Sequence, residues 1–228
     1  METSVMRKTA IGDFYHSRKE AEKLMIVSVL FSLLLLGIRV IMTGSPLFLF
    51  LPWNLFLAFT PLWLSSKLTN NPVLIENKKW FAIAFAGWIL LLPNSFYILT
   101  DLFHLKLRED SNRWFDLTLI FSFAWNGLLM GILSVRQMEK IIVHCFRLRQ
   151  EWLFLYPVMW LNAFGIYIGR YLRFNSWDMI TNPFQLLDDV VYMFVHPLRN
   201  FYPWAMICCF AVFMTIIYVS IKRLAKII

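Results

Sequence analysis

The sequence lacks the short motifs of the commonest catalytic and nucleotide-binding folds. It contains no G-x-x-x-x-G-K-[ST], G-x-G-x-x-G, G-x-S-x-G or H-E-x-x-H string. Nucleotide hydrolysis, dinucleotide redox chemistry and the common hydrolase and zinc-protease mechanisms therefore have no support. Cysteine is also scarce: Cys208 and Cys209 are adjacent and Cys145 stands alone, which indicates neither a disulfide framework nor a thiolate metal site.

Charged residues are also scarce. Only 16% of the 228 residues are charged, 59% are hydrophobic, and the mean hydropathy is +0.61, which together are far too apolar for an ordinary soluble domain. Six apolar windows are each near the ~20 residues that cross a bilayer, at about 23–42, 46–64, 80–105, 114–135, 152–170 and 203–221. We therefore predict an all-α polytopic membrane helix bundle with about six transmembrane helices and short amphipathic surface helices. A cytoplasmic leader over 1–22 precedes a single transmembrane domain over 23–228, whose first helix is retained.

The placement of Lys and Arg predicts the orientation of this bundle. The leader, the second and fourth connections and the C-terminus together hold 15 of these residues, whereas the opposite connections hold 6. The positive-inside rule then places both termini in the cytoplasm. The net charge of +8 lies where anionic lipid attracts it, so the predicted partner is the lipid bilayer and no nucleic acid is needed to explain the charge. A small-molecule or protein partner stays open.

The third window carries a polar stripe in its second half. Its members fall within roughly one third of a helix circumference, because a helix advances ~100° per residue; they are Asn94, Tyr97, Thr100, Asp101 and His104. Carboxylate and imidazole groups are expensive inside a bilayer and normally face a bundle interior or a water-filled cavity. The stripe is therefore the main functional signal in the sequence.

Other polar residues are predicted at the same, extracytoplasmic depth: Asn54, Asp116, Arg170, Arg173 and His196. We take Asp101 and His104 as candidate catalytic residues. Candidate metal ligands, for a divalent cation, are Asp101, His104, His196 and Asp116. Candidate binding residues are Asn54, Asn94, Tyr97, Thr100, Arg170 and Arg173.

Each candidate also has a purely structural interpretation. Asn54 and Asn94 each follow a proline within two residues and can satisfy freed backbone groups or bridge helices. Asp101 and His104 can pair with each other or with Arg170. Asp116 at a helix start suits the helix dipole, and Arg39, near the outer end of its helix, is expected to snorkel to the headgroups.

Two glycine pairs and two amphipathic segments complete the prediction. Gly127 with Gly131 and Gly165 with Gly169 form G-x-x-x-G pairs that let neighbouring helices approach closely, on faces predicted to carry Asp116, Asn162 and Arg173. The segment 183–195 is predicted as an outer surface helix, with a lid over the bundle mouth as the alternative. The segment 138–149 is predicted as a cytoplasmic surface helix.

The string P-N-S-x-Y-x-x-T-D-L-x-H over 93–104, with L-P-W-N over 51–54, resembles a known family. It is similar to the uncharacterised bacterial integral-membrane family known as domain of unknown function 1361, and the similarity covers most of the chain from the first span onward. The resemblance implies a multi-pass protein of a bacterial cell membrane, inner or plasma. It implies no activity and carries over no catalytic residue.

Three classes of function remain open. A structural or assembly role needs the stripe only for helix packing. A metal-dependent or acid–base membrane enzyme would use the outward-facing carboxylate and imidazole groups, since these suit a divalent cation that activates water. A small-solute or proton transporter would use the same stripe as a relay, with Arg170 and Arg173 attracting anions.

Overall fold

The structure is a computed structural model that describes the backbone of residues 2–107, 113–146, 148–172, 174 and 183–227. Side chains are described over 20–103, 113–146, 148–172, 174 and 184–225. Within those residues every regular element is a helix, which confirms the predicted all-α class. The helices are α1 (Glu2–Thr43), α2 (Phe50–Asn70), α3 (Pro72–Glu76), α4 (Lys78–Tyr97), the 3₁₀ helix η1 (Ile98–Leu107), α5 (Arg113–Phe146), α6 (Trp152–Arg170), α8 (Pro183–Val195) and α9 (Phe201–Ile227).

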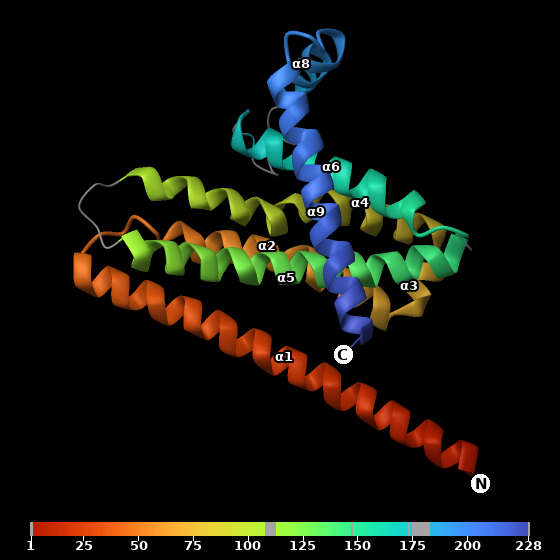
Figure 1. The fold of residues 1–228 in the computed structure, drawn as a ribbon. Helices are drawn as coiled ribbons and strands as arrows, with labels where there is room; N and C mark the ends of the chain where they lie inside the picture. Colours follow the sequence, from red (N-terminus) through yellow and green to blue (C-terminus); the bar gives the residue numbers. More distant parts are fainter. Residues whose placement is uncertain (1, 108–112, 147, 173, 175–182, 228) are drawn as a thin grey trace.

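The long helices fall into two groups by direction. Figure 1 shows α1, α2, α4 and α5 running roughly alongside one another, whereas α6 is inclined to them and α9 crosses them steeply. Helix α2 packs against both α4 and α5, α6 packs against α4 and α9, and α1 packs against α5. Helix α4 therefore lies between α2 and α6.

Five of the six predicted spans coincide with helices that are long and apolar enough to cross a membrane. They are Glu20–Thr43, Lys78–Phe103, Arg113–Phe146, Trp152–Arg170 and Phe201–Ala225. The predicted span at 46–64 coincides with α2, which is absent from that set. Helix α2 has 21 residues, which is long enough, but Pro61, Asn54 and Lys67 are among the residues that lower its hydropathy. The chain is therefore a multi-pass membrane protein with at least five apolar spans among its described residues.

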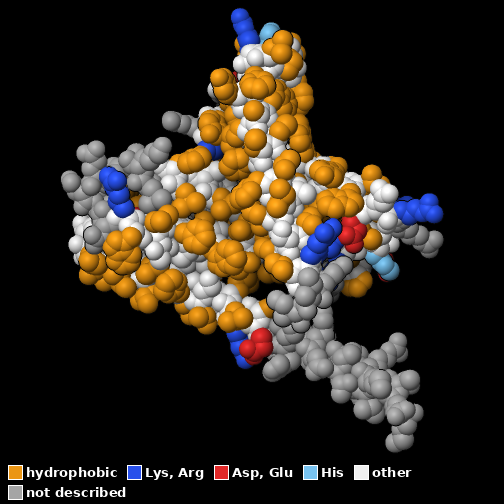
Figure 2. Space-filling view, in the orientation of Figure 1, with side chains coloured by type: hydrophobic (Ala, Val, Ile, Leu, Met, Phe, Trp, Pro, Cys, Tyr) orange, Lys and Arg blue, Asp and Glu red, His pale blue; other side chains and the backbone are white. Residues whose placement is uncertain are grey.

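Figure 2 shows the outer surface that such helices present. Hydrophobic side chains cover most of the visible face, and the described Lys, Arg, Asp and Glu side chains stand mainly near its edges. In water this distribution would be unfavourable, because a large contiguous apolar surface is costly to hydrate. In a bilayer the same surface contacts lipid.

A side-chain cap marks the start of helix α4, and a change of helix type marks its end. Asn77 caps its N-terminus, since the Asn77 side-chain oxygen accepts hydrogen bonds from the backbone N–H groups of Lys79 and Trp80 at 3.2 and 3.4 Å. The α-helix gives way to the 3₁₀ helix η1 after Tyr97. The sequence predicted one α-helix through 105, with ~100° of rotation per residue. That spacing is wrong beyond Tyr97, because a 3₁₀ helix advances by a third of a turn per residue.

Both predicted glycine pairs face α4. A Cβ atom added at Gly127 would lie 2.5 Å from the Ile98 side chain, and one added at Gly131 would lie 2.7 Å from Phe96. On α6, a Cβ atom at Gly165 would lie 2.4 Å from Cγ of Pro93. These positions have no room for a side chain, which confirms that the two pairs bring α5 and α6 into close contact with the third span.

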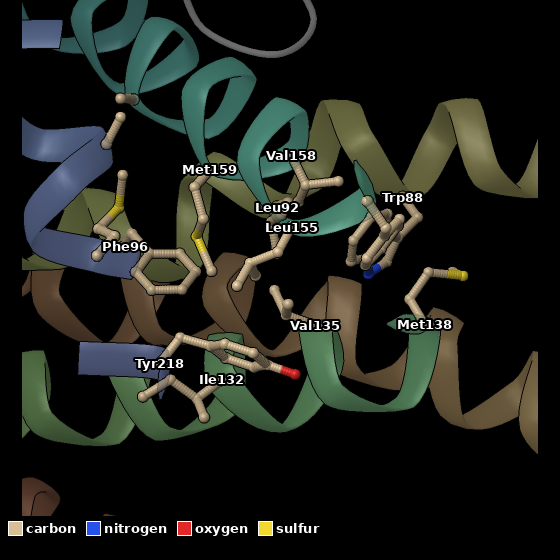
Figure 3. Packing of buried hydrophobic residues seen from close by; sticks show 14 of the residues in the cluster. Trp88, Leu92, Phe96, Ile132, Val135, Met138, Leu155, Val158, Met159 and Tyr218 are labelled. Carbon is tan, nitrogen blue, oxygen red and sulfur yellow. The ribbon is translucent and has the colours of Figure 1, made fainter. Parts of the chain in front are cut away.

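The main apolar core includes residues of α4, α5, α6 and α9 (Figure 3). Trp88 is fully buried, stacks on Phe154 of α6 at 6.2 Å between ring centroids, and donates its indole N–H to Ser134 Oγ of α5 at 2.7 Å. A buried indole needs such a partner, because an unpaired N–H would lose its hydration without compensation. This contact helps to fix α4 between its neighbours.

The predicted surface helix over 138–149 is wrong. Helix α5 runs without a break from Arg113 to Phe146, and Met138, Ile141 and Ile142 are buried in the core. The alternation of basic and apolar residues reflects one face of a continuous helix packed on its neighbours. The helix predicted at 183–195 is confirmed as α8, which lies beside the start of α9 in Figure 1.

Candidate functional site

A cavity of about 460 Å³ lies between α2, α4 and α6. The cavity is lined by Phe50, Trp53, Asn54 and Leu57 of α2, by Ile89, Leu90, Pro93, Asn94 and Tyr97 of α4, by Asp101 of η1, by Leu161, Phe164, Gly165, Ile168, Gly169 and Arg170 of α6, and by Phe174 and Leu186. On each of α2, α4 and α6 the lining residues recur at helical spacing, so each helix turns one face to it. Its size lies within the ~300–1,000 Å³ typical of small-molecule sites.

The polar side chains gather around Asp101. Asp101 is 1% exposed, and its Oδ2 accepts a hydrogen bond from Asn54 Nδ2 of α2 at 2.9 Å. Its Oδ1 lies 3.6 Å from Nη1 of Arg170, the last residue of α6. The carboxylate of η1 therefore connects α2 and α6 across the end of α4.

Arg170 also contacts other groups of α4 and η1. Its Nη2 donates to the backbone oxygen of Thr100 at 2.9 Å, and its Nη1 donates to the Tyr97 hydroxyl at 3.3 Å. The guanidinium carbon lies 5.7 Å from the Tyr97 ring centroid and 5.6 Å from that of Phe103. Aromatic rings and carbonyl dipoles stabilise a cation where water is scarce, so Arg170 can stay charged beside an apolar cavity.

The structure thus brings five of the predicted site residues to the lining of one cavity: Asn54, Asn94, Tyr97, Asp101 and Arg170. Thr100 is adjacent to these residues, and its polar groups bond to the protein itself. Its hydroxyl donates to the Tyr97 carbonyl at 2.6 Å, and its own carbonyl accepts from Arg170. The His104 side chain and Arg173 lie outside the described residues. The roles predicted for those two residues therefore stay predictions.

The remaining candidate metal ligands have other neighbours. Asp116 pairs with Arg39 of α1, and the His196 ring stacks on Tyr192 with centroids 4.6 Å apart. Among the side chains that the structure describes, no three His, Cys, Asp or Glu residues come together as a metal-binding group. Of the predicted ligands whose side chains the structure describes, Asp101 is the one that lines the cavity.

Arg39 does not snorkel, contrary to the sequence-based expectation. It is buried, its Nη2 donates to Asp116 Oδ2 at 3.0 Å, and its Nε pairs with Oδ1 of the same carboxylate. The interpretation of Asp116 as a simple terminal charge is incomplete for the same reason. Helix α1 packs on α5, so the Arg39 side chain pairs with a carboxylate of α5 and does not extend to the lipid headgroups.

A third buried carboxylate, toward the C-terminal end of α5, was not predicted from the sequence. Glu139 of α5 is 3% exposed and accepts from the Tyr218 hydroxyl and from Lys222 Nζ, both on α9. Lys222 also bonds Glu151 at the start of α6. The available signal was the spacing of Tyr218 and Lys222 by four residues, which places both groups on one helix face.

Asn162 was predicted to share the glycine face of α6. It points elsewhere: its Nδ2 lies 3.1 Å from the Met214 sulfur of α9, while Gly165 and Gly169 face α4. Three residues correspond to 300° of helix rotation, and a difference of 60° is enough to select a different neighbour.

Residues 53–217 match the family described as "Protein of unknown function (DUF1361)", which covers more than half of the chain. The chain therefore belongs to this family. Comparison with curated proteins and with solved structures gave no match.

Proposed function

We propose that this member of the DUF1361 family binds a small amphipathic molecule in the cavity between α2, α4 and α6. The observation that carries the proposal is a mostly apolar cavity wall that also carries one connected group of polar side chains, here called the polar end. The polar end consists of Asn54, Tyr97, Asp101 and Arg170, which come from three helices and η1 and contact one another in the cavity wall. A mostly apolar pocket with a few convergent polar groups is the usual form of a ligand site.

The apolar part is suited to an apolar body. Phe50, Trp53 and Leu57 contribute one wall, and Phe164 and Ile168 of α6 contribute the facing wall. The polar end offers donors in Asn54, Tyr97 and Arg170 and acceptors in Asp101 and the Asn54 amide oxygen, and Asn94 adds a further amide to the lining. A ligand that fills both parts has an apolar body and a polar head.

The contacts of Asp101 favour a role in binding. Its carboxylate accepts from Asn54 and faces Arg170, so it orients two donors that line the cavity. Acid–base chemistry or transport of the same ligand would both begin with this binding step. A purely structural pair would need no cavity beside it.

The proposed orientation follows from the distribution of Lys and Arg along the sequence. Both termini would face the cytoplasm, α2 would cross as a sixth span, and the polar end of the cavity would lie near the extracytoplasmic face. Reporter domains fused near Lys78 and after Ile228 should then be cytoplasmic, and one fused near Asn182 should be exported. An exported reporter at Lys78 would reverse the orientation.

The proposal is tested by filling the cavity. The wild type, Ile168→Trp and Leu153→Trp are purified in detergent, and the small molecules that remain bound are identified by mass spectrometry. Ile168 lines the cavity, whereas Leu153 lies on the same helix outside it and is exposed. The wild type and Leu153→Trp should retain a molecule that Ile168→Trp loses at least tenfold, with all three proteins equally folded by circular dichroism.

The proposal is contradicted if folded Ile168→Trp retains the same molecules in the same amounts as the other two proteins. It is equally contradicted if the wild type retains none. Should Ile168→Trp fail to fold, Leu57→Phe adds a smaller volume at the α2 wall and replaces it in the comparison.

A further inference from the structure

We infer that the ligand of this cavity is a phospholipid of the surrounding bilayer, which enters sideways between α2 and α6 with its phosphate toward Arg170. The inference rests on the proposed function, because it names the class of amphipathic molecule that the cavity takes. Three features of the cavity support it: where the cavity opens, how polarity changes along its length, and which donors stand at its polar end.

The cavity opens onto the apolar outer surface of the protein. Three of its lining residues are also exposed on that surface: Trp53 of α2 at 53%, Leu90 of α4 at 48% and Leu161 of α6 at 43%. Helices α2 and α6 both pack on α4, so the cavity is a groove with α4 as its floor. The surface that contacts lipid therefore continues into the groove without a polar barrier at these three residues.

Polarity changes along the groove in the order of a phospholipid. Leu90 and Leu161 lie in the middle of α4 and α6, where a spanning helix crosses the hydrocarbon. Arg170 is the last residue of α6 and of its apolar span, where the headgroup region begins. A bilayer lipid presents its chain and its head at these same two depths, so it can occupy the groove without leaving its normal position.

The donors at the polar end suit a phosphate. The Arg170 guanidinium is planar, stays charged and can bond two phosphate oxygens at once. Its Nη1 is 3.6 Å from Asp101 Oδ1, beyond the ~2.7–2.9 Å of a charge-assisted hydrogen bond. The Arg170 guanidinium also bonds Thr100 and Tyr97, so a phosphate would share it with these groups, and the Tyr97 hydroxyl and the Asn94 amide line the same groove.

The experiment uses a phosphatidylglycerol that carries a diazirine near the end of one acyl chain. The full-length protein is placed in phosphatidylcholine nanodiscs that contain a small fraction of this probe, irradiated, digested and mapped by mass spectrometry. Leu90 and Leu161 lie in the groove, whereas Leu34 of α1 and Phe213 of α9 are exposed near the middle of their spans outside it and so serve as controls of matched depth. Labelling at the first two positions should exceed that at the last two at least fivefold.

Two variants and two competitors sharpen the result. Ile168→Trp should reduce groove labelling to the level at Leu34 and Phe213, and Arg170→Gln should reduce it several-fold, whereas Arg199→Gln, at an exposed position, should not. Excess unlabelled phosphatidylglycerol should compete for the groove, and excess diacylglycerol, which lacks the phosphate, should compete several-fold more weakly.

The inference is overturned if groove and outer positions are labelled equally, or if diacylglycerol competes as well as phosphatidylglycerol. These outcomes can be told apart from failure of the proposed function. If the wild type still retains a molecule that Ile168→Trp loses, the cavity binds an amphipathic ligand that is not a phospholipid. If that retention is also absent, both the inference and the proposed function fail.

Discussion

Two of the ion pairs with a buried carboxylate, Arg39–Asp116 and Asp101–Arg170, differ in what surrounds them. Arg39 bonds Asp116 through two nitrogens, both residues are 5% exposed, and neither lines the cavity. Asp101 and Arg170 are 3.6 Å apart at their closest charged atoms, and both line a cavity of about 460 Å³. The first pair is closed, and the second faces a space that a ligand can fill.

The comparison teaches that a buried charge is not by itself a functional signal. Opposite charges that satisfy each other hold two helices together, as α1 and α5 are held here. A charge with a longer contact beside an apolar cavity retains the capacity to bind something else. Two Arg–Asp pairs are therefore expected to differ: one should matter more for stability, and the other for ligand binding.

The largest expected effect is at the closed pair. Asp116→Leu leaves the Arg39 guanidinium buried without its carboxylate and should destabilise the protein by ~3–5 kcal/mol, measured by thermal melting in detergent. Lys23→Gln, which breaks the exposed pair with Glu20, should cost no more than about 1 kcal/mol. The double variant Arg39→Leu/Asp116→Leu should recover most of the loss, and a double variant as unstable as Asp116→Leu would show that the pair is not a self-contained structural unit.

The next effect concerns the helix contact that forms one side of the cavity. Gly165→Ala places a Cβ atom 2.4 Å from the rigid Pro93 ring of α4 and should destabilise by ~1–3 kcal/mol. Gly37→Ala, where no atom lies within 4 Å, removes a flexible residue from the interior of α1 and should stabilise by ~0.5–1 kcal/mol. Melting shifts of the same sign in both variants would mean that α6 does not pack on α4 as closely as the structure has it.

The smallest effect on stability is expected at the open pair. Asp101→Asn keeps an acceptor for Asn54, and Arg170 retains its bonds to Thr100 and Tyr97, so the loss should be about 1 kcal/mol. Retention of the bound molecule in the mass-spectrometric assay should nevertheless change, because Asp101 orients two cavity donors. A loss of stability as large as that of Asp116→Leu, with unchanged retention, would place this pair in the same structural class as Arg39–Asp116.

Much of the fold could be predicted because it depends on local patterns. Apolar windows marked the spans, and the two glycine pairs marked the helix faces that approach α4. The candidate site could be predicted because polar and charged side chains such as Asn54, Asp101 and Arg170 cost free energy when they face lipid. Such side chains are therefore expected to contact one another inside the bundle. The grouping of these three residues could be expected from their shared predicted depth.

What could not be predicted depends on three-dimensional neighbours. Arg39 has a normal snorkelling pattern in the sequence, and only the packing of α1 on α5 brings it to Asp116. The segment after Met138 has the composition of a surface helix, and contacts with other helices decide that it is buried. The cavity itself is a gap between three helices, and no periodicity within one helix encodes a gap.

The most direct test of the central claim is an experimental density map of the protein in phospholipid nanodiscs, with a bound antibody fragment to enlarge the particle. The account predicts elongated density in the groove between α2 and α6, over Leu90 and Pro93 of α4, with its compact end beside Arg170. A groove closed by side-chain packing, or one that holds no density beyond isolated waters, would contradict the account.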